Sequence, residues 1–518
     1  MGRTRSRGSE TSSKPESVPS SWHRVATWAV AIVSFALAYG QFPLYEGNYN
    51  TYLLHGFAWA GRGQLEYDWL AKTSDPFPVF SALVAIPAAL DWRWFFYLGH
   101  GALLGVYLYA TVRLVEGVFG QSRPTSVVVL IPILALPQVW LGRDAISYAF
   151  NGDWGWYLQS GVAMQYLVGH MFQPSLFGVL CVASLAAFVQ RRDRIALLLA
   201  AAAVLLHFSY WIAALGLTAG YAFVRWRETG DGRAALRYAA AGFLLCAAAS
   251  LPVLRFIPTD AATAAEAARI LTNVRLPHHA LPSRWLGHPS IFWVQGPLLV
   301  AGAGVVWRTR IRWVFLMVLA FGALLFVAQV LTDSRPLALL FPWRVSVVLV
   351  PVAFSLVIGA LSRGLWARCP SRYASAFGTM LAILAAGYGY LHTRTQVREY
   401  ERDPIVPMLH AARAIATPQT LFAVPKDMQR FRLETGAPTF VDYKSHPYRD
   451  VEVIEWYARM SLIDELDAED PLQVCEAVAS LHERYGVAHF VRSTQHPLPC
   501  ARLGTAFQDA KFVIQHWR

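Results

Sequence analysis

The sequence predicts an all-α polytopic membrane domain of about eleven transmembrane helices, followed by a small C-terminal α/β soluble domain. Three observations support this prediction. Of the 518 residues, 55% are hydrophobic and only 15% are charged, whereas about a quarter of the residues of a soluble protein are charged. Apolar runs recur through residues 22–392, and most have the roughly 17–25 residues of a spanning helix. Residues 393–518 are more charged and contain no such run.

The basic connectors between the apolar runs predict the topology. Residues 1–21 are polar and basic and are expected to form a disordered cytoplasmic tail. Basic residues collect on the cytoplasmic side of a membrane, which accounts for the 45 Lys and Arg against 33 Asp and Glu. Eleven spans then place the C-terminal domain outside the plasma (inner) membrane. The spans are expected at 25–42, 94–115, 124–141, 174–189, 195–207, 209–224, 234–256, 291–307, 313–331, 343–361 and 373–391.

The irregular sequence is concentrated on the expected outer side. Its long segments are 44–93, 142–173 and 257–290, whereas the inner connectors are short. The run 79–90 is too short for an ordinary span, so it is expected to lie at the outer face or dip into it, and whether it spans stays open. A functional site is therefore expected outside. The positive charge forms no basic patch on a soluble module, so no nucleic-acid partner is expected.

The C-terminal domain, 393–518, alternates strand and helix patterns. Strands are expected at 421–424, 439–442, 488–491 and within 502–517, and helices at 428–434, 451–460 and 472–484. This alternation predicts a partly parallel α/β fold. Cys475 and Cys500 are the cysteines of this domain, and a disulfide in an oxidising compartment and two free buried thiols both remain open.

Carboxylates gather in the first outer segment. Glu46 and Asp68 are the candidate catalytic residues, and His55 and Asp75 are further candidates for the same cavity. On a helix, Asp68, Lys72 and Asp75 would share one face. Two structural explanations stay open beside the catalytic one. Asp68 can pair with Lys72, and Asp75 can cap a helix that begins with the following proline.

A second group of candidates is basic. Arg275, His278 and His279 lie between prolines in the third outer segment, and Arg335 lies in a later outer loop. Such cations and imidazoles suit a phosphate or pyrophosphate; a solvated loop is the alternative. No cofactor is certain. The two adjacent histidines leave a divalent cation open, although the ligand spacing indicates no metal site.

Two more candidates follow a predicted strand of the outer domain. Lys444 and His446 lie just beyond residues 439–442, and ligands often bind beyond the carboxyl ends of strands. A turn packed against the membrane domain explains them equally well. Polar residues of 142–173 are expected to line the same cavity.

The arrangement resembles the GT-C class of integral membrane glycosyltransferases. A carboxylate soon after the first span, a large first outer segment with surface helices, many spans and an outer α/β domain carry the likeness over nearly the whole chain. Residues 47–56, 68–71, 275–279 and 440–448 are similar to uncharacterised bacterial multi-pass proteins of that type. The resemblance implies transfer of a sugar from a polyprenyl-phosphate donor to a glycan, lipid or protein acceptor at the extracytoplasmic face. It also implies that Glu46, by its position, is the base, with Asp68 in reserve.

Two other classes of function remain open. A transporter or flippase of a lipid-linked envelope component predicts charged residues near the middle of its spans, whereas most charged residues here lie near predicted span ends. A non-catalytic envelope assembly protein, in contact with membrane lipids and a partner, predicts that Glu46, Asp68 and the histidine pair are dispensable.

Overall fold

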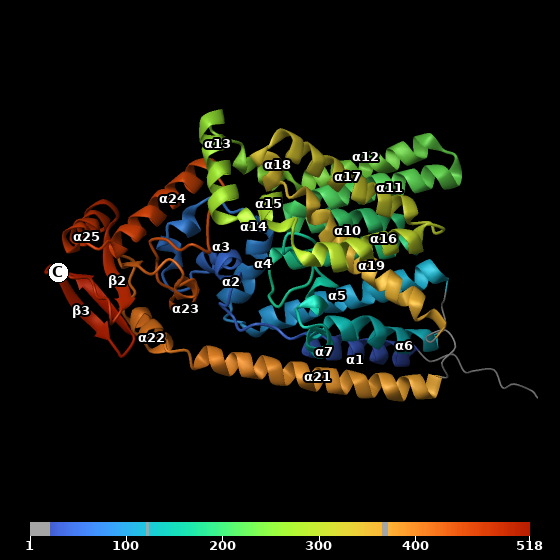
Figure 1. The fold of residues 1–518 in the computed structure, drawn as a ribbon, viewed down its shortest axis with the longest axis horizontal. Coiled ribbons are helices and arrows are strands. Elements are labelled where there is room, and N and C mark those ends of the chain that lie inside the picture. The colour runs from blue at the N-terminus through green and yellow to red at the C-terminus, as the bar shows by residue number, and fades with distance from the viewer. Residues whose placement is uncertain (1–20, 121–123, 365–370) are drawn as a thin grey trace, which may run out of the picture.

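The protein folds as a helical bundle with a small sheet at its C-terminal end, as the computed structural model shows (Figure 1). The structure describes residues 21–120, 124–364 and 371–518. The expected tail, 1–21, lies outside the described residues except for Ser21, which begins the first helix.

Each of the eleven apolar runs forms a helix, because a long apolar segment buries its backbone polar groups best by pairing them internally. These helices are α1 (Ser21–Tyr39), α5 (Trp94–Phe119), α6 (Pro124–Ala135), α9 (Val179–Val189), α10 (Asp193–Leu206), α11 (Trp211–Thr229), α12 (Gly232–Ala249), α16 (Gly296–Val306), α17 (Arg312–Thr332), α19 (Val345–Leu361) and α21 (Ser371–Glu401).

Few of these helices reach spanning length with sufficient hydropathy. Among the described residues, three helices do so by length and composition: Trp94–Phe119, Arg312–Thr332 and Arg335–Leu361. The segments Val128–Gln138 and Trp140–Phe150, bent by 57°, would together make a fourth. The topology of eleven spans therefore stays a prediction.

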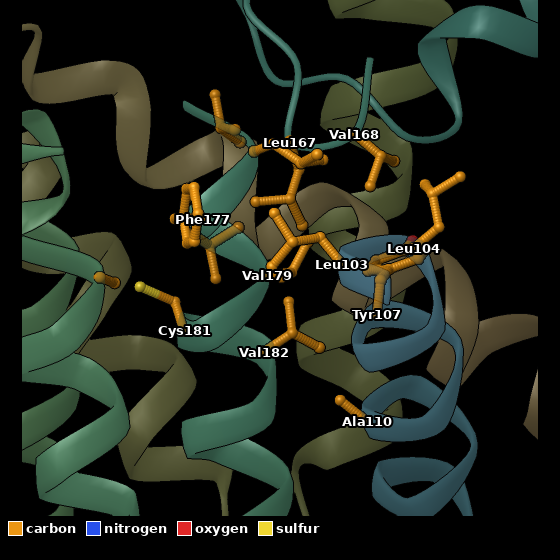
Figure 2. Close-up of a cluster of buried hydrophobic side chains, with 14 of the residues drawn as sticks. Leu103, Leu104, Tyr107, Ala110, Leu167, Val168, Phe177, Val179, Cys181 and Val182 are labelled. Carbon is orange, nitrogen blue, oxygen red and sulfur yellow. The ribbon is translucent and has the colours of Figure 1, made fainter. Parts of the chain in front are cut away.

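The bundle is held by close helix–helix packing. Figure 2 shows one part of the core, where Leu103 and Tyr107 of α5 lie near Val179 and Val182 of α9. Elsewhere α11 meets α17 at Gly220, where an added Cβ atom would lie 2.6 Å from the Cα atom of Val314. Small residues let helices in a membrane approach this closely.

The first outer segment folds as a series of short helices. Glycines at 61 and 63, with φ of +66° and +56°, end α3 because this backbone conformation does not continue a helix. Asp68 follows in an extended conformation, so Asp68, Lys72 and Asp75 do not share a helical face. The elements are α2 (Tyr49–Tyr52), α3 (Leu54–Trp59), η1 (Leu65–Tyr67), η2 (Leu70–Lys72) and α4 (Pro78–Ala89).

The other outer segments are also built from short helices, of which α13 lies beside α24 of the C-terminal domain (Figure 1). The elements are η3 (Leu136–Gln138), α7 (Trp140–Phe150), α8 (Trp154–Tyr157), η4 (Pro174–Gly178), η5 (Phe208–Tyr210), η6 (Leu251–Phe256), α13 (Ala261–Ile270), η7 (Leu271–Arg275), α14 (Pro277–Ala280), α15 (Pro282–Trp285), η8 (Ile291–Gln295), α18 (Arg335–Leu339) and η9 (Pro342–Arg344).

The C-terminal domain contains a four-stranded sheet of order β1-β2-β4-β3. Strand β1 pairs with β2 in parallel, and the other two pairings are antiparallel, so the partly parallel prediction is confirmed. The expected strand at 439–442 is wrong, since only a single bridge joins Thr439 to Phe422. The elements are α22 (Val406–Ile415), β1 (Leu421–Ala423), α23 (Phe431–Thr435), α24 (Asp450–Asp464), η10 (Glu465–Asp467), α25 (Pro471–Tyr485), β2 (Val487–Ser493), β3 (Leu503–Gln508) and β4 (Phe512–Trp517).

A shared apolar core joins this domain to the outer segments. Ile270 and Leu271 pack with Val453, Trp456 and Met460 of α24, and all five are buried. The long helix α21 also connects the domain to the far end of the bundle (Figure 1). The domain is therefore anchored to the bundle by packing and by covalent connection.

Cys475 of α25 and Cys500 form a disulfide, which decides between the two alternatives that the sequence left open. The double variant Cys475→Ser, Cys500→Ser is expected to lose about 2–5 kcal/mol of unfolding free energy, because the unfolded chain is no longer cross-linked. Thermal unfolding with and without reductant measures this loss. Reductant should lower the stability of the wild type and leave the variant unchanged; alkylation of both thiols in the unreduced wild type would contradict the prediction.

Candidate functional site

One cavity of about 500 Å³ lies where the outer segments meet the C-terminal domain. It draws its walls from segments far apart in the chain, which lie together because the shared core holds the domain against them. Polar, charged and aromatic side chains occur with aliphatic ones in its lining, which includes Asn48, Thr51, Tyr52, Gln165, Gln173, His207, Phe208, Trp211, Val253, Phe256, Arg275, His278, His279, Leu340, Phe341, Arg344, Lys444, His446, Tyr448 and Asp450.

Two arginines and one lysine line this cavity: Arg275, Arg344 and Lys444. Arg275 is buried and donates from Nη2 to the Lys444 carbonyl oxygen at 2.7 Å. The Nε atoms of Arg275 and Arg344 are buried without a hydrogen-bond partner. Among the ion pairs of the described residues, none involves these three cations. Since buried charge without a counter-charge is costly, the cavity is suited to an anion.

The histidines of the cavity are neutral near pH 7. Burial, followed by the neighbouring His278, lowers the pKa of His279 to about 3, and its Nδ1 lies 2.7 Å from the Ala163 carbonyl oxygen. Burial and then Arg275 lower the pKa of His278. The positive charge of the cavity therefore comes from the arginines and Lys444, with the imidazoles as neutral hydrogen-bonding groups.

Much of the remaining lining of the cavity is apolar and aromatic. Its side chains come from η5 and α11, from η6 and from the approach to η9: Phe208, Trp211, Val253, Phe256, Leu340 and Phe341. A mostly apolar pocket with a few convergent polar groups is typical of a ligand site. Here the combination suits a molecule that joins a phosphate to a hydrocarbon chain.

Glu46, the expected base, lies in a different groove. This groove, of about 470 Å³, is also lined by Tyr400, Asp403 and Arg430. Burial raises the pKa of Glu46, which Arg430 opposes and Asp403 and Glu434 reinforce. The expectation that Glu46 faces Arg275 across one cavity is not met, because the turn between Glu46 and Asn48 sends the two residues to separate hollows.

Asp68, the reserve base, is fully buried and lies in neither hollow. Its Oδ2 lies 2.7 Å from Arg432 Nε and accepts a hydrogen bond from Thr439 N at 2.8 Å. Its Oδ1 accepts from Leu70 N at 2.8 Å. Arg432 also pairs with Asp442. The carboxylate thus joins the first outer segment to the C-terminal domain, and the catalytic role expected for it stays a prediction.

Arg335, expected to bind phosphate, is exposed and does not line the cavity, whereas Arg344 does. Phosphate binding by Arg335 stays a prediction, and Arg344 is the arginine of this loop that the cavity contains. A signal for Arg344 was present in the sequence, because a single arginine at the start of the apolar run 343–361 needs a polar environment. Among the polar residues of 142–173, Gln165 and Gln173 line the cavity.

Asp75, His55 and His446 meet in a small pocket of about 20 Å³ beside the main cavity. Asp75 Oδ1 accepts from Phe77 N at 2.7 Å, as a cap of the turn before α4, while its Oδ2 is buried without a partner. Both ring nitrogens of His446 are likewise buried and unpartnered. Burial lowers the pKa of His55, and Asp75 partly opposes this shift. His446 lines both hollows.

A metal-binding arrangement was left open by the sequence. In the described ranges, no group of three or more His, Cys, Asp or Glu residues is placed to hold a metal ion.

The comparisons with known proteins reach a small part of the chain. Residues 404–463 match a family described as a domain of unknown function (DUF6798). The matched stretch runs from the start of the C-terminal domain into α24 and carries Arg432, Asp442, Lys444 and His446. No curated protein matches the chain. The similarity therefore covers the part of the domain that contacts the cavity and the buried ion pairs.

Proposed function

We propose that the protein is a membrane glycosyltransferase that takes a sugar from a polyprenyl-phosphate-linked donor at the extracytoplasmic face. The observation that carries this proposal is the main cavity, where three cations without carboxylate partners lie beside an apolar wall. Charge-assisted hydrogen bonds from arginine suit a phosphate, and the apolar wall suits the first units of a lipid chain.

Two features of the fold support a membrane enzyme with an outer site. Large apolar side chains are exposed on the bundle helices, including Val300, Leu324 and Leu331, and exposed apolar surface of this kind is typical of contact with lipid. The disulfide between Cys475 and Cys500 is typical of an oxidising compartment, which favours an extracytoplasmic C-terminal domain.

A second candidate function is a non-catalytic envelope assembly protein that binds a lipid phosphate. The observation that favours it is the position of Glu46 and Asp68, since neither carboxylate lines the cavity. Binding of the lipid is common to both candidates, so transfer of the sugar distinguishes them.

The test uses the full chain reconstituted in lipid vesicles. Binding is measured with a short-chain polyprenyl phosphate, and transfer is measured with a panel of radiolabelled polyprenyl-phosphate sugars and an envelope extract as acceptor. Binding with transfer of one sugar supports the glycosyltransferase. Binding without transfer of any sugar in the panel rejects it in favour of the assembly protein, and absence of both rejects the two candidates together.

A further inference from the structure

The small pocket beside the main cavity holds two buried polar groups that the structure leaves unpartnered. Asp75 and His446 are each about 95% buried, at 5% relative exposure. The free oxygen is Asp75 Oδ2, and the free nitrogens are both ring atoms of His446. Buried polar groups are hydrogen-bonded in the great majority of cases, so each unpartnered group needs an explanation.

The volume of this pocket offers an explanation for the unpartnered groups of Asp75 and His446. Its volume, about 20 Å³, exceeds the roughly 10–15 Å³ that one water molecule requires. A buried water also needs two to four polar partners. Asp75, His446 and the hydroxyl groups of Thr51 and Thr73 line the pocket and satisfy that need. One water can therefore join the Asp75 carboxylate to the His446 imidazole.

His446 also lines the main cavity, so it borders both hollows. We propose that His446 is the general base of the transfer reaction and that Asp75, through a bridging water, is the residue that positions it. This inference rests on the proposed function and deepens it, because it supplies the base that neither Glu46 nor Asp68 provides in this cavity.

The reaction balances as a single displacement. A hydroxyl group of the acceptor attacks the anomeric carbon of the donor sugar, and a new C–O bond forms there. The bond between that carbon and the phosphate oxygen breaks, and polyprenyl phosphate leaves with the electron pair. The hydroxyl proton passes to a ring nitrogen of His446, and the Asp75 carboxylate stabilises the resulting imidazolium through the water. His446 afterwards returns the proton to solvent.

The surroundings of His446 favour its neutral, proton-accepting form. Burial and then the charge of Arg275 hold the pKa of His446 well below its usual range; the nearby Lys444 backbone opposes this shift, and the Lys444 charge adds to it. Besides Arg275 and Lys444, the titratable groups that line the two hollows around it are Tyr52, His55, Asp75, Tyr166, His207, His278, His279, Arg344, Tyr448 and Asp450. Two of these groups are carboxylates, which favour a positive charge on the ring, and of the two only Asp75 shares the small pocket with His446. Losing the Asp75 carboxylate should lower the pKa of His446 further.

The test compares His446→Gln and Asp75→Asn with His496→Gln, a control at an exposed turn outside both hollows. We expect His446→Gln to lower kcat about 100-fold or more while the Kd for polyprenyl phosphate changes less than 3-fold. The wild type should show a rise of kcat with pH below pH 6.5 that the His446→Gln variant lacks, and Asp75→Asn should move this rise to lower pH. The control should match the wild type.

The outcomes separate this inference from the proposed function. A wild type that transfers sugar, with His446→Gln retaining kcat or the same pH profile, overturns the inference alone. A wild type without transfer overturns the proposed function, and the inference falls with it. Loss of lipid-phosphate binding by His446→Gln would indicate that this variant fails to fold, and Asp75→Asn then decides. A pH profile of Asp75→Asn that matches the wild type overturns the inference, and a shift of the profile to lower pH supports it.

Discussion

Replacing Arg432 with methionine is expected to lower the free energy of unfolding by about 3–5 kcal/mol. Arg432 is 2% exposed in its side chain and lies between Asp68 and Asp442, at 0% and 2%. Methionine fills a similar volume but leaves two carboxylates buried together without a cation. Burial alone would lower the pKa of Arg432, but the two carboxylates outweigh it and raise that pKa.

This loss should reach beyond Arg432 itself. The carboxylate of Asp442 accepts a hydrogen bond from Ser445 N at 2.6 Å, and the Ser445 hydroxyl donates to the Asn50 carbonyl oxygen at 3.2 Å. The loop that carries Lys444 and His446 is thus held by the same ion pairs. We expect Arg432→Met to weaken lipid-phosphate binding in addition to stability.

Denaturation in detergent, followed by tryptophan fluorescence, measures the change in the free energy of unfolding. Arg402→Met is the matched control, because Arg402 is exposed and exposed substitutions usually stay within about 0.5 kcal/mol. Adding Asp68→Asn and Asp442→Asn to Arg432→Met should recover part of the loss, since the triple variant buries no unpaired charge. A single variant as stable as the wild type would show that the ion pairs do not hold the domain.

Replacing Arg344 with glutamine should weaken the binding of polyprenyl phosphate about 10- to 100-fold, because a hydrogen bond to a charged group contributes about 1.5–3 kcal/mol. Replacing Arg344 tests phosphate binding in the cavity more clearly than replacing Arg275 does. The Arg275 side chain also holds the Lys444 carbonyl oxygen, so its removal would disturb the loop as well as the ligand.

Arg335→Gln is the control for this experiment. Both arginines belong to the same outer turn of the chain, but Arg335 is exposed and outside the cavity, so its variant should bind within 2-fold of the wild type. Raising the salt concentration should weaken wild-type binding more than that of Arg344→Gln, since a charge is absent from the variant. Equal loss in the two variants would indicate a general surface attraction and contradict a phosphate site in this cavity.

The site residues show where local sequence is informative. Arg275, His278, His279, Lys444 and His446 were all expected in one cavity, and the structure brings them together. They lie in outer segments rich in polar groups, and such groups need a polar environment wherever the chain folds. The sequence could therefore identify these residues as candidates for one site, but it could not identify the residues that each of them contacts.

Glu46 and Asp68 show where local sequence is insufficient. Asp68 had a nearby cation, Lys72, at helical spacing, yet its partner is Arg432, 364 positions along the chain. The two glycines at 61 and 63 break the helix on which the local pairing depended. Glu46 lies only two residues from Asn48, which lines the main cavity, but a tight turn directs it into another groove.

The sequence by itself determined the helical bundle, the positions of its apolar helices and the alternation of strands and helices in the C-terminal domain. Those features depend on hydrophobic periodicity and length, which are properties of contiguous residues. Only the tertiary structure decided that Asp68 pairs with Arg432, that Arg344 rather than Arg335 enters the cavity, and that Asp75 and His446 share a pocket. Each of these depends on how the domain packs on distant outer segments, and the energy of a buried pair is set by that packing and not by spacing along the chain.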